Sequence, residues 1–249
     1  MAVACLAAAC YAQPMTVEQA VDERVEILAS QVESLGFRAL ATAHSFASAM
    51  PLAPALAVKK ALVEYVWEEL QRFETASDLY MQLKPGEDLH AVVQPRLSDV
   101  RPPSTWLEMA IIQFLYDRAG VVQMREMAAS GDERVAKLAA RILEGERMHK
   151  IMGGEGGNAL RNMLLSDPDR RPHAQDYFDR WLAESLRSFG RPGSPRSRRA
   201  IELGLRQRDS AEVIRDYLAA LEPIVTACGL RLPSRAQLGL ELPADVGLA

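Results

Sequence analysis

The sequence predicts an all-α protein with a four-helix bundle core and additional C-terminal helices. Apolar residues recur at helical spacing through most of the 249 residues, whereas alternating patterns rich in β-branched residues are nearly absent. Capping residues, prolines and glycines divide the periodic stretches into segments of helical length. Long helices joined by short connections pack against one another as a bundle. These observations indicate one helical domain.

Two long helices are predicted in the first third of the chain. The first extends from about residue 16 to 50, with a break near Leu35-Gly36, and the second covers residues 54–84. Pro85-Gly86 ends the second helix, because proline cannot donate a helical hydrogen bond and glycine readily adopts the conformation that follows a helix. The proline-rich stretch after it is predicted to be a loop.

Two further helices complete the predicted core. Thr105 and Glu108 have the spacing of a capping box, which predicts a helix from there to about residue 130. Gly131-Asp132 then turns the chain into a helix that reaches at least Met152. The GGEGG segment at residues 153–157 follows this helix and lacks the lysine of a phosphate loop, so it indicates a helix break.

The C-terminal third contains the additional helices. Asp167-Pro168 begins one of them, since a capping residue followed by proline is typical of a first helical turn. Residues 189–198 are predicted to be a loop, and residues 209–228 form a last amphipathic helix. We divide the chain into a leader or disordered N-terminus (1–15), a helical domain (16–233) and a C-terminal tail (234–249).

The leader is apolar but differs from a secretory signal. It contains no lysine or arginine, and its apolar stretch is short, so it is either a disordered leader or an extension before a true start at Met15 instead of Met1. No stretch of the sequence approaches the roughly 20 apolar residues that a membrane span requires. We therefore expect a cytoplasmic protein without a membrane partner.

Charge and cysteine content exclude two classes of function. The formal net charge of -4 and the pI near 5.7 do not give the basic surface that nucleic-acid binding needs. Cys5, Cys10 and Cys228 form neither a disulfide framework nor a Cys-x-x-Cys metal pair, which suits a reducing compartment. Neither nucleic-acid binding nor cysteine chemistry is expected.

Ionisable residues interrupt the apolar stripes of three predicted core helices near mid-helix. Glu69 and Arg72 lie on the inward stripe of the second helix, Asp117 on that of the third, and Glu146 and His149 on that of the fourth. Buried carboxylates must share cations, protons or a metal, because burying an unpaired charge is costly. The Glu-x-x-His spacing of the last pair binds iron or manganese in helical bundles. The cluster predicts either a metal site or a structural ion network.

Several segments, taken in order, resemble a known family. They are AHS at residues 43–45, APALAVKKALVEYVWEEL, WLEMAIIQFLYDRAG, EGERMH, RWLAESLRSFG and IRDYLAALEPIVTACGLRLP. Over about residues 35–233 the chain resembles the catalytic, ferritin-like subunit of phenylacetyl-CoA epoxidase, in the phenylacetic acid catabolic protein family. No single segment is specific, but their order and spacing carry the resemblance. The longer C-terminal extension of that family is missing here.

The resemblance implies a ferritin-like bundle whose four core helices hold a di-iron centre. Four residues match the family's ligand pattern and are our predicted metal ligands: Glu69, Asp117, Glu146 and His149. Phe46 falls at the position of the first-helix glutamate, and Arg72 falls at that of the first Glu-x-x-His histidine. Neither side chain can donate to iron. Iron is therefore expected to be partial or absent.

His44 is the histidine of the first helix that could substitute for the missing ligand. His44 lies two residues from Phe46, which places it about 200° around the helix, so an exposed or structural role is favoured. Arg72 offers a forked donor to the neighbouring carboxylates, and a cation of the protein could thereby replace one from solution.

Three functions remain open. The resemblance favours the first, a di-iron-type monooxygenase with altered ligands that oxidises an aromatic or acyl-CoA-type small molecule and requires a reductase. The second is a metal-free structural partner of another ferritin-like subunit. The third is a metal-free acid–base enzyme with five catalytic candidates: Glu69, Arg72, Asp117, Glu146 and His149. In each case we expect the chain to form an oligomer.

Overall fold

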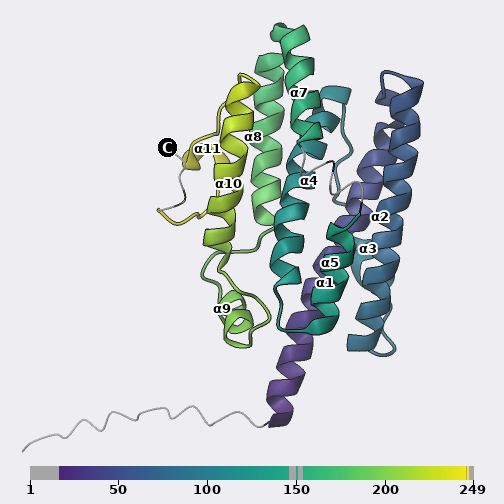
Figure 1. Cartoon of the computed structure of the whole chain (residues 1–249), viewed down its shortest axis with the longest axis vertical. Coiled ribbons are helices and arrows are strands. Elements are labelled where there is room, and N and C mark those ends of the chain that lie inside the picture. Colours follow the sequence, from purple (N-terminus) through teal and green to yellow (C-terminus); the bar gives the residue numbers. More distant parts are fainter. Residues whose placement is uncertain (1–16, 146–149, 151–153, 245, 247–249) are drawn as a thin grey trace, which may run out of the picture.

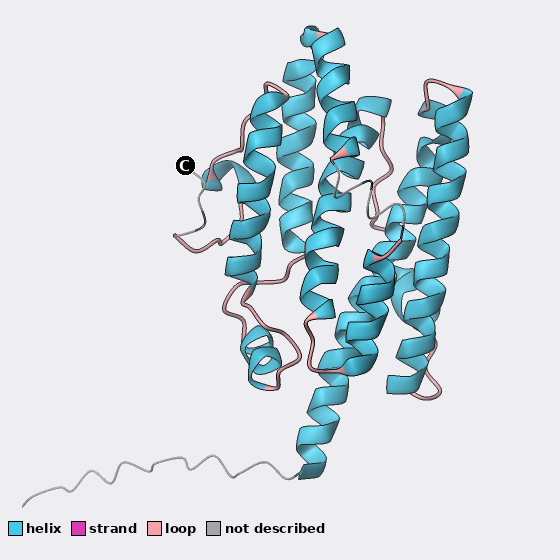
Figure 2. Ribbon diagram, in the orientation of Figure 1, coloured by secondary structure: helices cyan, strands magenta, loops and turns pink. Residues whose placement is uncertain are grey.

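The computed structural model describes residues 17–145, 150, 154–244 and 246, and within these residues the chain consists of helices and loops without a strand (Figure 2). The prediction of an all-α bundle with additional C-terminal helices is confirmed. Its elements are α1 (Val17–Ala49), η1 (Met50–Leu52), α2 (Leu56–Leu83), α3 (Leu89–Leu97), α4 (Trp106–Ala128), α5 (Glu133–Leu143), α7 (Glu155–Ser166), η2 (Pro168–Arg170), α8 (Arg171–Arg187), α9 (Pro195–Glu202), α10 (Ser210–Ala227) and α11 (Arg235–Leu238).

The long helices lie roughly parallel or antiparallel to one another (Figure 1). Helix α1 packs along the length of α2, and α4 packs against α5 on one side and α7 and α8 on the other. Helix α2 forms one edge of the bundle, at the right in Figure 1, and α10 and α11 lie toward the opposite edge. Buried side chains form two large clusters, one mainly from α4, α7, α8 and α10 and the other mainly from α1, α2, α3 and α5.

The predicted break in the first helix is wrong. Helix α1 continues through Gly36 to Ala49. A Cβ atom at Gly36 would come within 2.7 Å of the Leu89 side chain, so the missing side chain allows α3 to approach α1 closely. This glycine serves packing between helices, a role that local sequence does not distinguish from a helix break.

The proline-rich connection after α2 contains a helix that the sequence analysis missed. Asp88 caps α3 by accepting a hydrogen bond from the backbone N–H of His90 at 3.0 Å. Leu89, Val93 and Leu97 recur every fourth residue and are buried in the core. Pro95 lies inside the helix. The apolar face of α3 is stabilised by its packing on α1 and α2, which outweighs the effect of the proline.

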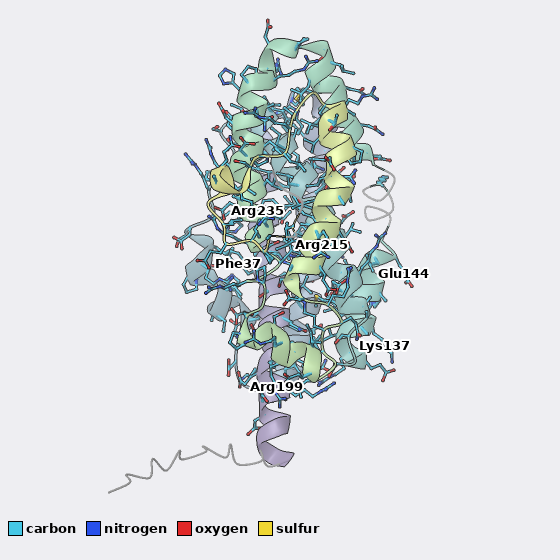
Figure 3. All side chains as sticks on the ribbon, turned by 90° about the vertical axis from the view of Figure 1, so that its left-hand side faces the viewer. Phe37, Lys137, Glu144, Arg199, Arg215 and Arg235 are labelled. Carbon is cyan, nitrogen blue, oxygen red and sulfur yellow. The ribbon has the colours of Figure 1, made fainter. Side chains whose placement is uncertain are left out.

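The predicted loop at residues 189–198 ends earlier than expected, because α9 begins at Pro195. Ser194 caps this helix by accepting from the backbone N–H of Ser197 at 3.2 Å. Arg199, labelled toward the lower end of the molecule in Figure 3, forms an ion pair with Glu23 of α1 at 2.9 Å. This ion pair links α9 to the first helix. The last predicted helix, over 209–228, is confirmed as α10.

The predicted helix from residue 132 to at least 152 is wrong in its length. Helix α5 ends at Leu143, and the backbone N–H of Gly145 turns back to the carbonyl of Ile142. Residues 146–149 and 151–153 lie outside the described residues, as does the predicted leader at residues 1–15. The predicted break near residues 153–157 is confirmed by Gly154, whose φ of 89° precedes the start of α7. No helix in the described ranges is long and apolar enough to cross a membrane.

Candidate functional site

A cavity of about 760 Å³ is enclosed mainly by α1, α2, α4 and α8. Its wall is largely apolar, with Phe46, Met109 and Ile112 among the lining side chains. Its charged lining residues comprise six arginines and four acids: Arg38, Arg72, Arg96, Arg101, Arg180, Arg187, Glu69, Asp99, Asp117 and Glu184. Two of the arginines, Arg96 and Arg180, pair with acids outside this lining, Glu33 and Glu108.

An ion pair on α2 lies at the inner wall of this cavity. Arg72 Nη1 donates to Glu69 Oε1 at 2.6 Å, and the two side chains are only 16% and 6% exposed. Arg72 Nη2 also lies 4.0 Å from Glu68 Oε2. The three-residue spacing between Glu69 and Arg72 places both on one face of the helix, as predicted. The guanidinium therefore compensates a carboxylate that would otherwise need another cation.

An aromatic contact occupies the position of the expected first-helix ligand. Phe46 of α1 is fully buried, and its ring centroid lies 5.4 Å from that of Tyr65 in a tilted arrangement. Such a contact stabilises the packing of α1 on α2. His44, the substitute ligand considered above, is exposed, as are His90 and His173.

The structure brings three of the five predicted site residues to one cavity. Glu69 and Arg72 reach it from α2, and Asp117, which is half-buried, reaches it from α4. The other two, Glu146 and His149, lie outside the described residues. Their predicted roles therefore stay predictions.

The donor set does not fit a complete di-iron centre. Phe46 carries no donor atom, and the Arg72 guanidinium is hydrogen-bonded to the carboxylate of Glu69, itself a predicted ligand. In the ranges that the structure describes, no group of three or more His, Cys, Asp or Glu side chains is arranged to hold a metal ion. The positions where the resemblance implies two metal ligands thus carry an aromatic contact and an internal cation.

Arg38 is a cavity residue that the sequence analysis missed. It is half-buried on α1, and its Nε donates to the carbonyl oxygen of Ser34 at 3.2 Å. Burial lowers the pKa of its guanidinium to about 10, and the charge of Glu69 opposes this shift. Among the described residues, no carboxylate lies within 4 Å of it. The residue follows Leu35 by three positions, so the test for charges on an inward stripe could have found it on the first helix.

Glu108 is a second residue whose position was not foreseen. Its carboxylate is buried where α4 meets α8: Oε2 accepts from the backbone N–H and the hydroxyl of Ser104, at 2.7 and 2.6 Å, and Oε1 accepts from Trp181 Nε1 at 2.9 Å. Arg180 Nη1 lies 3.4 Å away. Burial by itself would raise the pKa of Glu108, but the hydrogen bonds from Ser104 and Trp181 and the charge of Arg180 lower it overall. Glu108 thereby holds Trp181 and Arg180, two residues of the cavity lining, in position.

The capping box predicted at this helix start is only half formed. Thr105 accepts from the backbone N–H of Glu108 at 3.0 Å, as expected. The Glu108 side chain, however, bonds Ser104 in place of the Thr105 backbone. The buried Trp181 donor draws the carboxylate inward, a contact that local sequence could not reveal.

The cavity lining also contains an arginine that lies over an aromatic ring. The guanidinium carbon of Arg96 lies 4.1 Å from the centroid of the Phe37 ring, and Arg96 Nη1 donates to Glu33 Oε1 at 2.8 Å. Phe37 is labelled on the left flank of the molecule in Figure 3. Because Arg96 already has an acidic partner and an aromatic one, it contributes less free charge to the cavity than Arg38.

Comparison with known protein families identifies a match for this chain. The sequence model of the family described as phenylacetic acid catabolic protein matches residues 15–241 of the chain. A search of curated proteins finds no match to this sequence. The family match spans all four helices that enclose the cavity.

Proposed function

The chain belongs to the phenylacetic acid catabolic protein family, and from that premise we propose that it is a metal-free, ferritin-like component of an oxygenase system, acting beside a separate catalytic subunit. The observation that carries this proposal is the buried ion pair between Arg72 and Glu69. It lies where the resemblance places one of the Glu-x-x-His pairs that bind iron. A permanently charged guanidinium supplies there the positive charge that a metal would otherwise provide.

Electrostatics and donor chemistry both favour this role over an iron enzyme. An iron ion beside Glu69 would meet the positive charge of Arg72 in a partly buried site, where screening by water is weak. It would also lack the donor that Phe46 replaces. The alternative, a monooxygenase served by a reductase, would need Glu69, Asp117, Glu146 and His149 to bind iron in spite of both substitutions.

Metal content tests the proposal directly. Protein produced in iron-supplemented cells should contain iron far below one atom per chain, measured by elemental analysis. The double variant Phe46→Glu/Arg72→His restores both missing donor types, so its iron content should rise toward roughly two atoms per chain, as in other carboxylate-bridged bundles.

Two controls make this result interpretable. The single variant Phe46→Glu keeps the Arg72 cation and should stay poor in iron, and His44→Ala changes only an exposed side chain. Stoichiometric iron in the unmodified protein, together with oxidation of an aromatic acyl-CoA when a reductase is added, would contradict the proposal and support the monooxygenase.

The cavity supports a second candidate function, the binding of an anionic small molecule. The observation that favours it is Arg38, which faces a cavity of about 760 Å³ and has no acidic partner within 4 Å among the described residues. An aromatic acid or a CoA thioester combines an apolar body with negative charge, which matches an apolar wall lined by arginines. In the acid–base form of this candidate, Asp117, Glu146 or His149 would transfer a proton beside Arg72.

Arg38→Met should weaken such binding by about 10- to 100-fold, because a hydrogen bond to a charged group contributes roughly 1.5–3 kcal/mol. Titration calorimetry with phenylacetate and with phenylacetyl-CoA would measure this effect. Lys137→Met removes the same charge from an exposed position on α5 and serves as the matched control. Equal affinity in the two variants, or no binding by the unmodified protein, would rule out this role for Arg38.

A further inference from the structure

The outer face of α2 carries a line of exposed apolar side chains. Of the six large apolar residues that are exposed in the described part of the chain, five lie on this helix, and we call these five the α2 seam: Leu56, Val63, Trp67, Leu70 and Met81. Leu56 is 70% exposed and Trp67 is 60% exposed. Figure 1 shows α2 at an edge of the bundle, and the exposure of these side chains indicates that no other described helix covers this face. Monomeric proteins rarely leave such a set uncovered.

The seam follows one stripe of the helix. At about 100° of rotation per residue, its five members fall within an arc of about 60°. The opposite stripe of α2 contains Leu62, Glu69, Ala76 and Leu83, which are buried in the bundle. Helix α2 is therefore apolar on two faces, one that packs inside this chain and one that points outward.

The seam is self-complementary when two copies of α2 run antiparallel. A two-fold axis midway between Glu68 and Glu69 places Leu56 opposite Met81 of a second copy and Trp67 opposite Leu70. The fifth member, Val63, then lies opposite Glu74, which is exposed on the same stripe. Each contact then occurs twice, which is the property of an isologous interface. The seam extends over nearly the whole helix, from its first residue to within two residues of its end.

Two charged residues beside the α2 seam are also placed so that they would pair in an antiparallel dimer. Lys60 and Asp78 are both exposed and flank the stripe on the same side, and neither forms an ion pair within the described residues. The two-fold axis brings Lys60 of one copy to within one residue position of Asp78 of the other. In a parallel pair, equivalent residues lie at the same height, so Lys60 of one copy would stay 18 residue positions from Asp78 of the other.

We propose that α2 mediates an antiparallel, two-fold dimer of this chain, with Trp67 and Leu70 at its centre and two Lys60–Asp78 ion pairs near its ends. The partner is a second copy, because four of the five apolar members of the seam, together with Lys60 and Asp78, are matched within one helix. This inference does not depend on the metal content or on the ligand of the cavity.

Sedimentation velocity of the full chain over a range of concentrations tests the dimer. The unmodified protein should form dimers, and Trp67→Ala should raise the dissociation constant by about 30-fold or more, as for a central aromatic residue of an interface. Leu165→Ala is the matched control, because Leu165 is also large, apolar and exposed but lies on α7. Circular dichroism of each variant would verify that the fold is retained.

Charge exchange tests the antiparallel arrangement. Lys60→Asp and Asp78→Lys should each weaken the dimer, whereas the double variant Lys60→Asp/Asp78→Lys should recover it, because each ion pair is re-formed with reversed sign. A dimer that does not recover, or that is insensitive to Trp67→Ala, would overturn the proposal. A chain that stays monomeric alone and binds only a different subunit through α2 would overturn it too, while leaving the proposed role as a partner subunit intact.

Discussion

Replacing Glu108 with alanine is expected to lower the free energy of unfolding by about 3 kcal/mol, since breaking a buried, hydrogen-bonded charge cluster costs this much. The carboxylate accepts from Ser104 twice and from Trp181 once. Without it, the indole N–H of the buried Trp181 loses its acceptor. The link between the start of α4 and the middle of α8 is lost as well.

Urea unfolding, followed by circular dichroism and tryptophan fluorescence, would measure this difference. Glu133→Ala provides the control, because Glu133 is also an acid at the start of a helix but is exposed and pairs with Lys137 on the surface. Exposed pairs of this kind contribute about 0–1 kcal/mol. Equal losses in the two variants would show that the buried Glu108 cluster contributes no more to stability than an exposed pair does.

The contribution of Glu108 should also depend on pH. Its pKa in the folded protein is lowered from the ordinary value of 4.5, so the folded state binds this proton less readily than the unfolded state does. The stabilisation is therefore fully present above the unfolded pKa and is lost as the pH falls through the folded pKa. The difference in unfolding free energy between the unmodified protein and Glu108→Gln should accordingly be larger at neutral pH than in acid.

Arg72→Leu is expected to cost a similar amount, about 3 kcal/mol, because it leaves a buried carboxylate without its guanidinium. Glu69 is 5% exposed and accepts from Arg72 at 2.6 Å. The double variant Glu69→Gln/Arg72→Leu removes both charges, so it should recover most of the loss. This recovery would show that the two charges require one another.

A double-mutant cycle over these two positions would measure the coupling free energy between them. The surface pair Glu133 and Lys137 gives the reference, where the coupling should be small because both side chains are exposed. If the Glu69–Arg72 coupling were no larger than this reference, Arg72 would not supply the charge compensation on which the metal-free role depends.

Helical periodicity alone predicted that Glu69, Arg72 and Asp117 lie on the inward faces of their helices. Each interrupts an apolar stripe, and an apolar stripe faces the core wherever its helix packs. The same rule, applied to the first helix, would have found Arg38, but the predicted break at Gly36 obscured the continuity of that stripe. The glycine accommodates Leu89, which is 53 positions further along the chain, so no local signal could distinguish its role.

The sequence by itself determined the all-α class, the family and most of the long helices, and it shows that positions 46 and 72 carry side chains without a donor for a metal. These depend on periodicity and on side-chain chemistry, both of which are local. Only the tertiary structure decided that Arg72 bonds Glu69 and that Glu108 joins α4 to α8. Glu108 and Trp181 are 73 residues apart, and contacts over such separations form only when packing brings the helices together. The exposed apolar face of α2 could also be identified only from the tertiary structure, because the packing of the whole bundle determines which side chains of a helix stay exposed.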